Sequence, residues 1–486
     1  MTRFTASLVP LVLAGVATAY TPAPAAPASP PPRAAAEPAS RSAEAGRPFV
    51  RTYLPRDYGG ADQNWAIEQD DRGVIYVGNN VGVLEYDGAS WRTIRMPNRT
   101  TIRSLAKDGH GRIYVGAVGE LGYLEPDATG GTRFVSLLDQ VPPENRVFAD
   151  VWRTLITPEG VYFQSPQFLF RWSDGRFRVW KPKSRFYRAA VAAGTLYVGQ
   201  PETGLMKMVG ETLEEIPGGR QFVEEQRPVI LPYDEGRILI GTRAAGLFLA
   251  DGKTVTRFPT DVDPWLRTMD LYRGAVLPDG TFALATTGGG MSIIDRQGRL
   301  LHSFDSSSGV GDSLYYVFPD RQGALWLGMD GGLARIETPS PVSLFDRTSG
   351  LVGGGVSSIR RHDGTLYVTT SRGVFYLARP AGHAGAGLSR LTTASFVPVT
   401  GISTTAQSWW LESVDDPAGR RPAQLLVATG DGLYRIDGAK AVPIRESVAG
   451  SFQPAVLLRS KRNPARIFVG LFDGLAAVRL DDGGQW

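Results

Sequence analysis

Aromatic and arginine residues recur at one position of this sequence, eight residues before a series of glycines. The seven residues found there are Trp65, Arg103, Trp152, Phe186, Pro228, Tyr272 and Tyr315. The residues directly after four of them are Arg153, Tyr187, Arg273 and Tyr316. An aromatic face suits a planar or sugar ligand, and a guanidinium group suits a carboxylate or a sulfate. The pattern predicts a binding site for a carbohydrate, which could be acidic, or for another small molecule.

The ligand-binding residues predicted in this way are Trp65, Arg103, Trp152, Arg153, Tyr187, Tyr272, Arg273 and Tyr315. Packing is the alternative explanation, because aromatic side chains on the innermost strands of a repeat fold also fill the space between repeats. The sequence leaves both interpretations open. Substitution of Trp152 or Tyr315, with folding and ligand binding followed in parallel, separates them.

Residues typical of catalytic and metal sites are few. The four histidines, His110, His302, His362 and His383, are scattered and lack the spacing of a metal site or a catalytic triad. His110 and His362 fall in predicted turns, where we expect them to be exposed. Asp-Gly pairs such as Asp279–Gly280 are ordinary turn residues. We therefore expect a protein that is not an enzyme, with no catalytic residues, no metal and no cofactor.

Composition excludes further classes of protein. The 52 Lys and Arg residues nearly balance the 48 Asp and Glu residues, and no basic run is long enough to follow a phosphate backbone. Nucleic acid is therefore not an expected partner. The chain has no cysteine, which excludes disulfides and thiolate metal sites. Its 58 glycines among 486 residues indicate many tight turns.

The first residues have the pattern of an export signal. Arg3 precedes an apolar run, and the small residues Ala17 and Ala19 fit a cleavage site, so we predict a signal peptide over 1–19. The run is too short for a comfortable membrane span of about 20 residues. Residues 20–47 are rich in Ala, Pro and Ser and are predicted to form a disordered linker. Nothing after the linker has transmembrane length. The expected location is the periplasm or the exterior of the cell.

A repeat of about 40 residues accounts for most of the remaining chain. Each copy has a polar turn ending in Gly, an apolar run, a glycine step and a second apolar run. Ten copies can be recognised, at Asp70–Trp91, Gly109–Pro126, Pro158–Gly175, Ala193–Met208, Asp234–Gly252, Pro278–Asp295, Asp320–Ile336, His362–Leu377, Ala423–Gly438 and Ala465–Leu480. Both the period and the alternation of residues are typical of a four-stranded propeller blade.

The predicted fold is all-β. It is a β-propeller with one seven-bladed ring of four-stranded blades over residues 48–345. About three blades of a second, incomplete propeller follow over 346–486. Helical periodicity is absent, and the repeat glycines are expected to serve hairpin turns and the close approach of neighbouring blades.

The seventh copy carries the most specific motif. Asp320, Gly323, Trp326 and Gly328, followed by Gly332–Leu333, form the pattern D-x-x-G-x-x-W-h-G-x-x-x-G-L, where h is an apolar residue. This pattern resembles the two-component-regulator propeller repeat, and the resemblance covers roughly Phe49 to the end of the chain. It implies the exported ligand-binding region of a bacterial membrane signalling protein. Such regions usually contain two seven-bladed propellers, followed by a small β-sandwich, a membrane span and an output module.

Two segments raise the question of how the rings close. Pro48–Pro55 resembles a fourth strand without partners, and we expect it to complete the seventh blade. Trp486 falls where the fourth strand of the tenth blade would begin, so we expect an unpaired edge there and a sequence that is a fragment of a longer protein.

The functional hypothesis is a periplasmic ligand-sensing propeller that lacks its membrane and output parts. Its expected partner is a small molecule or an oligosaccharide, and the full-length protein is expected to be able to form dimers. A stand-alone secreted binding or scaffold module is the first alternative, and a polysaccharide lyase or hydrolase is the second. The coding sequence directly after Trp486 distinguishes the sensor from the stand-alone module, and turnover on a polysaccharide panel tests the lyase or hydrolase.

Overall fold

Strands dominate the part of the chain that the computed structural model describes. The described residues are 46–128, 130–338, 342–378, 394–403, 405–416, 419, 421–447, 451–481 and 483–486. The predicted signal peptide, most of the predicted linker and His383 lie outside them. Among the described residues, no helix is long and apolar enough to cross a membrane.

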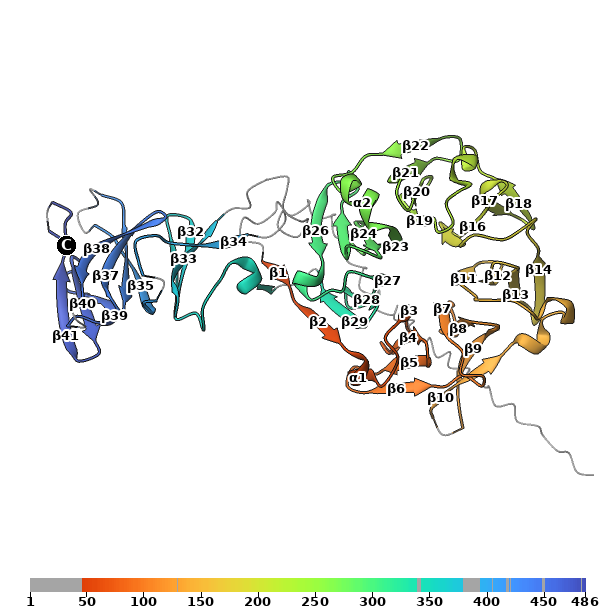
Figure 1. The fold of residues 1–486 in the computed structure, drawn as a ribbon, viewed down its shortest axis with the longest axis horizontal. Helices are drawn as coiled ribbons and strands as arrows, with labels where there is room; N and C mark the ends of the chain where they lie inside the picture. Colours follow the sequence, from red (N-terminus) through yellow and green to blue (C-terminus); the bar gives the residue numbers. More distant parts are fainter. Residues whose placement is uncertain are drawn as a thin grey trace, which may run out of the picture. The chain divides into compact units, whose positions relative to one another are not determined.

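Seven four-stranded antiparallel sheets follow one another around a common centre (Figure 1). The first sheet contains β3 (Asn64–Gln69), β4 (Ile75–Asn79), β5 (Gly82–Tyr86) and β6 (Trp91–Ile94). The second contains β7 (Ile102–Lys107), β8 (Ile113–Ala117), β9 (Glu120–Pro126) and β10 (Thr132–Ser136). The third contains β11 (Arg153–Thr157), β12 (Gly160–Gln164), β13 (Leu169–Ser173) and β14 (Arg176–Trp180). The fourth contains β15 (Ala190–Ala192), β16 (Thr195–Gln200), β17 (Gly204–Val209) and β18 (Thr212–Glu215).

The remaining sheets of the ring follow the same plan. The fifth contains β19 (Val229–Pro232), β20 (Ile238–Gly241), β21 (Leu247–Ala250) and β22 (Val255–Phe258). The sixth contains β23 (Leu271–Val276), β24 (Phe282–Thr286), β25 (Met291–Ile294) and β26 (Leu300–Phe304). The seventh contains β27 (Leu314–Pro319), β28 (Ala324–Met329), β29 (Gly332–Glu337) and β2 (Val50–Tyr53). The innermost strands contact one another in the cyclic order β3, β7, β11, β15, β19, β23, β27 and again β3. The predicted propeller is therefore confirmed.

In most blades the second strand is the most buried and the outermost strand is the least buried. The second strands β4, β8, β24 and β28 are buried along their whole length. Outer strands such as β14 and β18 are largely exposed or half-buried. A strand covered on both faces by neighbouring blades reads as a continuous apolar run, whereas an outer strand alternates.

The seventh blade is completed by the start of the chain. Strand β2 pairs antiparallel with β29, from Val50 opposite Ile336 to Tyr53 opposite Leu333. This confirms the predicted role of Pro48–Pro55. Just before it, β1 (Arg47–Pro48) pairs with β30 (Ser343–Leu344), and Arg47 forms an ion pair with Asp346. The sequence pattern placed Arg47 in the linker. Its pairing was missed because its partners lie about 300 residues away along the chain.

The predicted all-β fold is confirmed, and the structure adds short helical segments that the sequence did not indicate. Two short α-helices, α1 (Pro55–Tyr58) and α2 (Asp263–Met269), and five 3-10 helices lie between the described strands. The 3-10 helices are η1 (Leu138–Gln140), η2 (Pro143–Asn145), η3 (Gly219–Phe222), η4 (Ser306–Ser308) and η5 (Arg347–Ser349). Helix α2 begins at a proline-containing turn and buries Leu266 in the core. Segments of this length are too short to show a helical period.

Three further sheets follow the ring. They contain β31 (Ser358–His362), β32 (Thr365–Thr370), β33 (Gly373–Ala378) and β34 (Ser395–Pro398); β35 (Ser408–Val414), β36 (Gln424–Thr429), β37 (Gly432–Asp437) and β38 (Lys440–Glu446); and β39 (Pro454–Arg459), β40 (Arg466–Leu471) and β41 (Gly474–Arg479). Among the described residues the last sheet has three strands, as expected. Trp486 packs on its core, and its indole N–H donates to Gln424.

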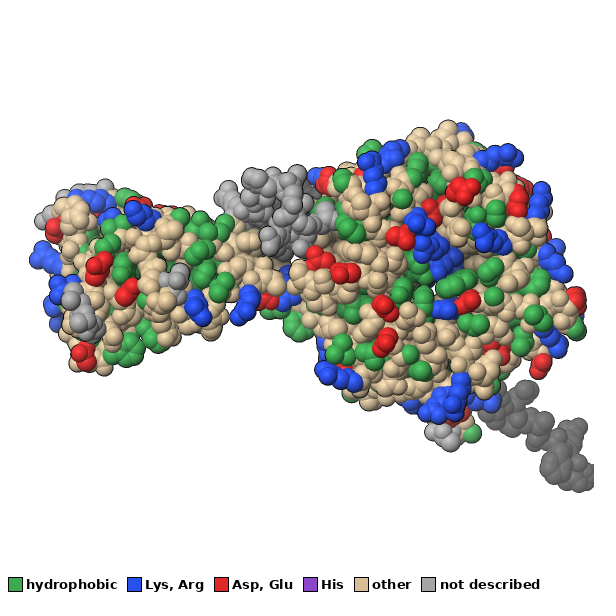
Figure 2. All heavy atoms as spheres, in the orientation of Figure 1, with side chains coloured by type: hydrophobic (Ala, Val, Ile, Leu, Met, Phe, Trp, Pro, Cys, Tyr) green, Lys and Arg blue, Asp and Glu red, His purple; other side chains and the backbone are tan. Residues whose placement is uncertain are grey.

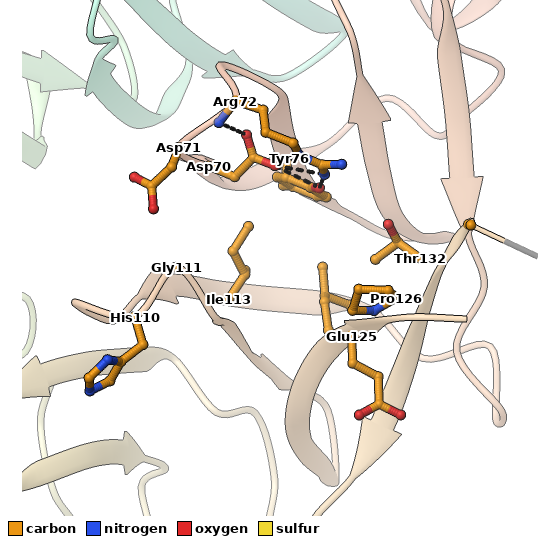
Figure 3. Close-up of a pocket in the computed structure, with 13 residues that line it drawn as sticks. Asp70, Asp71, Arg72, Tyr76, His110, Gly111, Ile113, Glu125, Pro126 and Thr132 are labelled. Atoms are coloured by element: carbon orange, nitrogen blue, oxygen red, sulfur yellow. Dashed lines mark hydrogen bonds and ion pairs between the residues drawn. The ribbon is translucent and has the colours of Figure 1, made fainter. Parts of the chain in front are cut away.

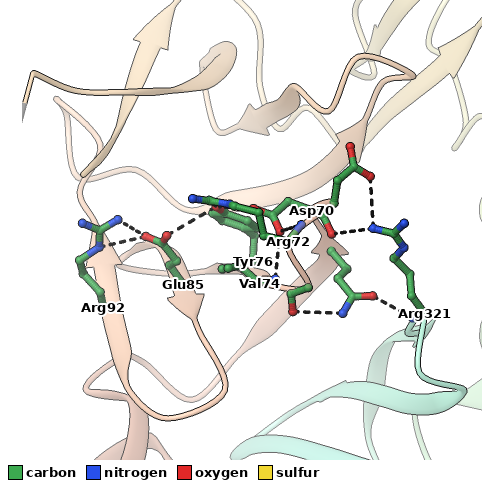
Figure 4. A network of polar contacts seen from close by, with 10 residues as sticks. Asp70, Arg72, Val74, Tyr76, Glu85, Arg92 and Arg321 are labelled. Carbon is green, nitrogen blue, oxygen red and sulfur yellow. Dashed lines mark hydrogen bonds and ion pairs between the residues drawn. The ribbon is translucent and has the colours of Figure 1, made fainter. Parts of the chain in front are cut away.

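The aspartate that opens the repeat turn is a hydrogen-bond acceptor for the backbone. Asp320 Oδ1 accepts from the amides of Gln322 (3.0 Å) and Ala324 (2.8 Å). Its Oδ2 accepts from the buried indole N–H of Trp326 (3.0 Å). Asp70 holds the corresponding turn of the first blade in the same way (Figure 4). The motif thus fixes a turn and orients a core tryptophan.

Replacing Asp320 with alanine is expected to lower the free energy of unfolding by about 1–3 kcal/mol, because buried donors lose their acceptor. Urea denaturation measures this loss. Asp251→Ala is the matched control, since Asp251 accepts from Lys253 and Thr254 in an exposed turn. An equal loss in the two variants would contradict the role of burial.

Candidate functional site

Six side chains from the innermost strands and the segments leading into them meet at the centre of the ring. We call them the central cluster: Trp65, Arg103, Trp152, Arg188, Tyr272 and Tyr315. Figure 2 shows Lys and Arg side chains next to hydrophobic side chains in the middle of the ring. The residues come from five different blades and from the segment just before β15, which belongs to a sixth. The fold therefore brings together side chains up to 250 positions apart.

The contacts of the central cluster form a closed circuit. Tyr315 stacks on Trp65 with ring centroids 4.4 Å apart. The guanidinium carbon of Arg103 lies 4.2 Å from the ring of Trp65 and 4.7 Å from that of Trp152. Arg188 lies 4.5 Å from the ring of Trp152 and 4.4 Å from that of Tyr272. Tyr272 meets Tyr315 edge-on at 5.8 Å and closes the circuit.

Further arginines surround this circuit. Arg153 is 8% exposed, and its Nε donates to the carbonyl of Ala189 (3.2 Å). Arg273 is half-buried and lies 4.2 Å from the ring of Tyr316. Burial, together with the positive charges of Arg273 and Arg188, lowers the pKa of Arg153 well below its usual value. The centre of the ring is thus rich in positive charge.

Two carboxylates accompany other arginines of this region. Asp150 forms an ion pair with Arg103 at 2.5 Å. Asp270 forms ion pairs with Arg227 and Arg243, both at 3.1 Å. These pairs neutralise Arg103 and Arg227, whereas Arg153, Arg188 and Arg273 have no ion pair with a carboxylate among the described residues.

The structure brings together most of the residues predicted from the sequence. Trp65, Arg103, Trp152, Tyr272 and Tyr315 belong to the central cluster. Arg153 and Arg273 lie beside it, since their charges act on each other and on Arg188.

Three other positions of the pattern lie outside the cluster, and of these only Tyr187 was predicted to bind a ligand. Tyr187 is buried, and the guanidinium carbon of Arg185 lies 5.6 Å from the centre of its ring. Phe186 packs in the core between the third and fourth blades. Pro228 is buried just before β19 and contributes no aromatic or charged group.

Arg188 was missed because the turn lengths differ. Five residues, 70–74, join the last paired residue of β3 to β4, but only Ala193 and Gly194 join β15 to β16. Counting a fixed distance back from the turn glycine therefore gives the wrong position in the fourth blade. Counting back from the last paired residue of each inner strand aligns Arg188 with Trp65 and Arg103. A correction for hairpin length could have found it.

The central cluster offers aromatic rings and donors to a ligand. Trp65, Trp152 and Tyr315 are half-buried, so part of each ring remains accessible. Burial raises the pKa of Tyr315, and its phenol therefore stays protonated at neutral pH. Stacking with partial exposure and unpaired guanidinium groups are the features of a site for a sugar or an anionic group. The contacts between these aromatic side chains also hold neighbouring blades together.

A hollow lies between the first two blades (Figure 3). Its volume is about 400 Å³, and it is lined by residues that include Asp70, Asp71, Arg72, His110 and Glu125. The lining charges already have partners: Arg72 pairs with Asp70, and Asp71 with Lys107. This hollow lies at the turns that follow β3 and β7. The central cluster is at the opposite ends of these two strands.

The histidines give no metal site in the part of the chain described here. No group of three or more His, Cys, Asp or Glu residues is placed to hold a metal ion there. His110 is exposed in a turn as predicted. His362 differs from the prediction: it ends β31, its side chain is 10% exposed, and its Nδ1 lies 3.1 Å from Ser413 Oγ. The neighbouring strand β35 covers it, which local sequence does not show.

The fold and its centre define a β-propeller whose inner strands present aromatic and arginine side chains to one another. No protein-family model matches the chain, and no curated protein matches it. Among solved structures, the extracellular domain of a B. thetaiotaomicron protein assigned as a hybrid two-component system is similar, with a TM-score of 0.64 and 19% identity. The match covers 90% of this chain and 59% of that chain.

A second extracellular domain from B. thetaiotaomicron, assigned to a one-component system, matches with a TM-score of 0.47 and 17% identity over 90% of this chain and 60% of that one. This chain thus spans about three-fifths of the length of the extracellular domains it matches. The fold implied by the resemblance to the two-component-regulator propeller repeat is confirmed by the first of these structures.

Proposed function

We propose that this chain is the exported ligand-binding region of a bacterial membrane signalling protein. The observation that carries the proposal is the central cluster, in which six side chains from different blades meet at the centre of a sensor-like propeller. A site assembled from many blades responds to small changes in their packing. Ligand binding there would change how blades pack, and segments outside this sequence would pass that change to an output module.

The ligand in this proposal is a carbohydrate or another small molecule that contacts the exposed parts of Trp65, Trp152 and Tyr315. Tryptophan and tyrosine stack on sugar rings, and the nearby guanidinium groups donate hydrogen bonds. The role is binding, because the central cluster consists of aromatic and guanidinium groups, which suit recognition. The proposed site of action is the periplasm or the cell exterior, reached through the predicted signal peptide.

The test is ligand binding by the full chain. A panel of neutral and acidic oligosaccharides is screened by thermal unfolding, and each hit is measured by isothermal titration calorimetry. Trp65→Ala is expected to weaken binding of a hit by about 2 kcal/mol, a factor of about 30 in Kd, as for a central aromatic contact.

Trp410→Ala is the matched control, since Trp410 is 37% exposed and lies in β35, outside the ring. Circular dichroism confirms that both variants fold. Equal Kd values for wild type and Trp65→Ala would place the ligand elsewhere and contradict the proposal.

A further inference from the structure

Three arginines at the centre of the ring carry positive charge without a carboxylate partner. They are Arg153, Arg188 and Arg273, and we call them the arginine triad. Among the described residues none of the three forms an ion pair with Asp or Glu. Each instead faces aromatic rings, backbone carbonyls or the other two arginines.

Arg188 shows most clearly that a partner is missing. The residue is 8% exposed, and its guanidinium is enclosed between Trp152 and Tyr272. Its Nη2 donates to the hydroxyl of Tyr272, but its Nη1 is buried and has no hydrogen-bond acceptor. A buried donor on a charged group is costly to leave unpaired.

The charge of Arg153 also lacks a carboxylate partner among the described residues. It is as buried as Arg188, and its hydrogen bonds go to neutral acceptors, the carbonyls of Ala189 and Trp152. A guanidinium group remains protonated at neutral pH in proteins. Two positive charges are therefore held out of water, with Arg273 acting on both.

In two neighbouring arginines, the positive charge is neutralised by a carboxylate of the protein itself. Arg103 has Asp150, and Arg227 has Asp270. The described residues supply no such carboxylate to the arginines of the triad. Arg273 is half-buried, so the triad is open to solvent on its side.

We propose that the arginine triad binds an oxyanion, the carboxylate or sulfate group of the ligand, which supplies the missing negative charge. This inference deepens the proposed function and rests on it, because it names the group by which a ligand would enter the centre of the ring. The oxyanion accepts hydrogen bonds from Arg188 Nη1 and from Arg273, and the central cluster contacts the rest of the ligand.

The experiment uses inorganic sulfate as the probe. The full chain, purified without sulfate or phosphate, is titrated with sodium sulfate by isothermal titration calorimetry, and with sodium chloride at matched ionic strength. D-glucuronate and D-glucose are titrated in the same way to separate a ligand carboxylate from a free anion. We expect saturable binding of sulfate and of glucuronate, with chloride and glucose giving no comparable signal.

Arg188→Met and Arg273→Met are expected to weaken sulfate binding at least about tenfold, the loss of one charged hydrogen bond. Arg237→Met is the control, because Arg237 pairs with Asp234 in an outer turn. A purely structural role makes a different prediction: Arg188→Met would unfold at lower temperature while sulfate binding stayed unchanged. If Arg188→Met fails to fold, Arg273→Met alone tests the inference, because the side chain of Arg273 is only half-buried.

Absence of saturable binding of both sulfate and glucuronate to the wild type would overturn the inference, as would equal affinities in wild type and Arg273→Met. These failures are separable from failure of the proposed function. A neutral oligosaccharide that binds the wild type and is lost in Trp65→Ala would preserve the proposed function and remove only the oxyanion site.

Discussion

Replacing Tyr53 with alanine is expected to lower the free energy of unfolding of the ring by about 3–5 kcal/mol, the range for loss of a buried aromatic side chain. Tyr53 ends β2, is 5% exposed, and stacks on Trp326 with ring centroids 5.6 Å apart. It also meets Tyr86 and Trp91 of the first blade edge-on, at 5.7 and 5.6 Å. One side chain thus joins the closing strand to both the seventh and the first blade. Urea denaturation followed by tryptophan fluorescence measures the loss.

Tyr53→Phe is the conservative control. It keeps the stacked ring and is expected to remain close to wild type at neutral pH. Burial, together with the neighbouring Tyr86, raises the pKa of Tyr53 to about 12. Because a phenol in the unfolded chain ionises near pH 10, wild-type stability should fall as pH rises from about 10 to 12. The stability of Tyr53→Phe should fall less over that range.

A loss under about 1 kcal/mol in Tyr53→Ala would contradict the role of β2 in closing the ring.

Gly328→Ala is expected to have the second large effect on stability. A β-carbon at Gly328, in β28, would lie 2.4 Å from the carbonyl oxygen of Asn64 in β3. The obstacle is backbone, so the seventh and first blades must separate to accept a methyl group. Overpacking of this kind costs about 1–3 kcal/mol or more. Thermal unfolding is expected to show a lower transition temperature and earlier loss of tryptophan fluorescence.

Gly236→Ala is the matched control for Gly328→Ala. Gly236 lies in a turn of the fifth blade, and no atom lies within 4 Å of a β-carbon built there. Its φ is not positive, so alanine adds no backbone strain. Equal stability of Gly328→Ala and wild type would show that the blades at the closure have more freedom than the structure indicates.

Much of the fold could be predicted because its signals are local and repeated. Residues that correspond to Asp320, Gly323 and Trp326 recur in several blades, because the five-residue hairpin turn uses an acceptor, a flexible residue and a core side chain at fixed positions. The role of Pro48–Pro55 was also visible, because a β-strand pattern without neighbours needs a partner. The pairing of Arg47 with Asp346 was not visible, since it joins residues far apart in sequence.

The central site could be predicted only in part, because it depends on register. Trp65, Arg103, Tyr272 and Tyr315 were found where the inner hairpin has the common length. Arg188 was hidden by the two-residue turn at Ala193 and Gly194. The unpaired state of Arg188 could not be inferred at all, since it depends on which carboxylates lie near it in space. Composition shows a nearly balanced charge, whereas the centre of the ring is locally positive.

The central claim is that the middle of the ring is a ligand site. The most direct test is a crystal structure of the full chain with an acidic oligosaccharide that binds in the panel. The predicted result is ligand density in contact with Trp65 and Tyr315, with its carboxylate or sulfate group against Arg188 and Arg273. Density confined to the hollow beside Asp70 and His110, or to the outer surface, with an unchanged central cluster, would contradict the claim.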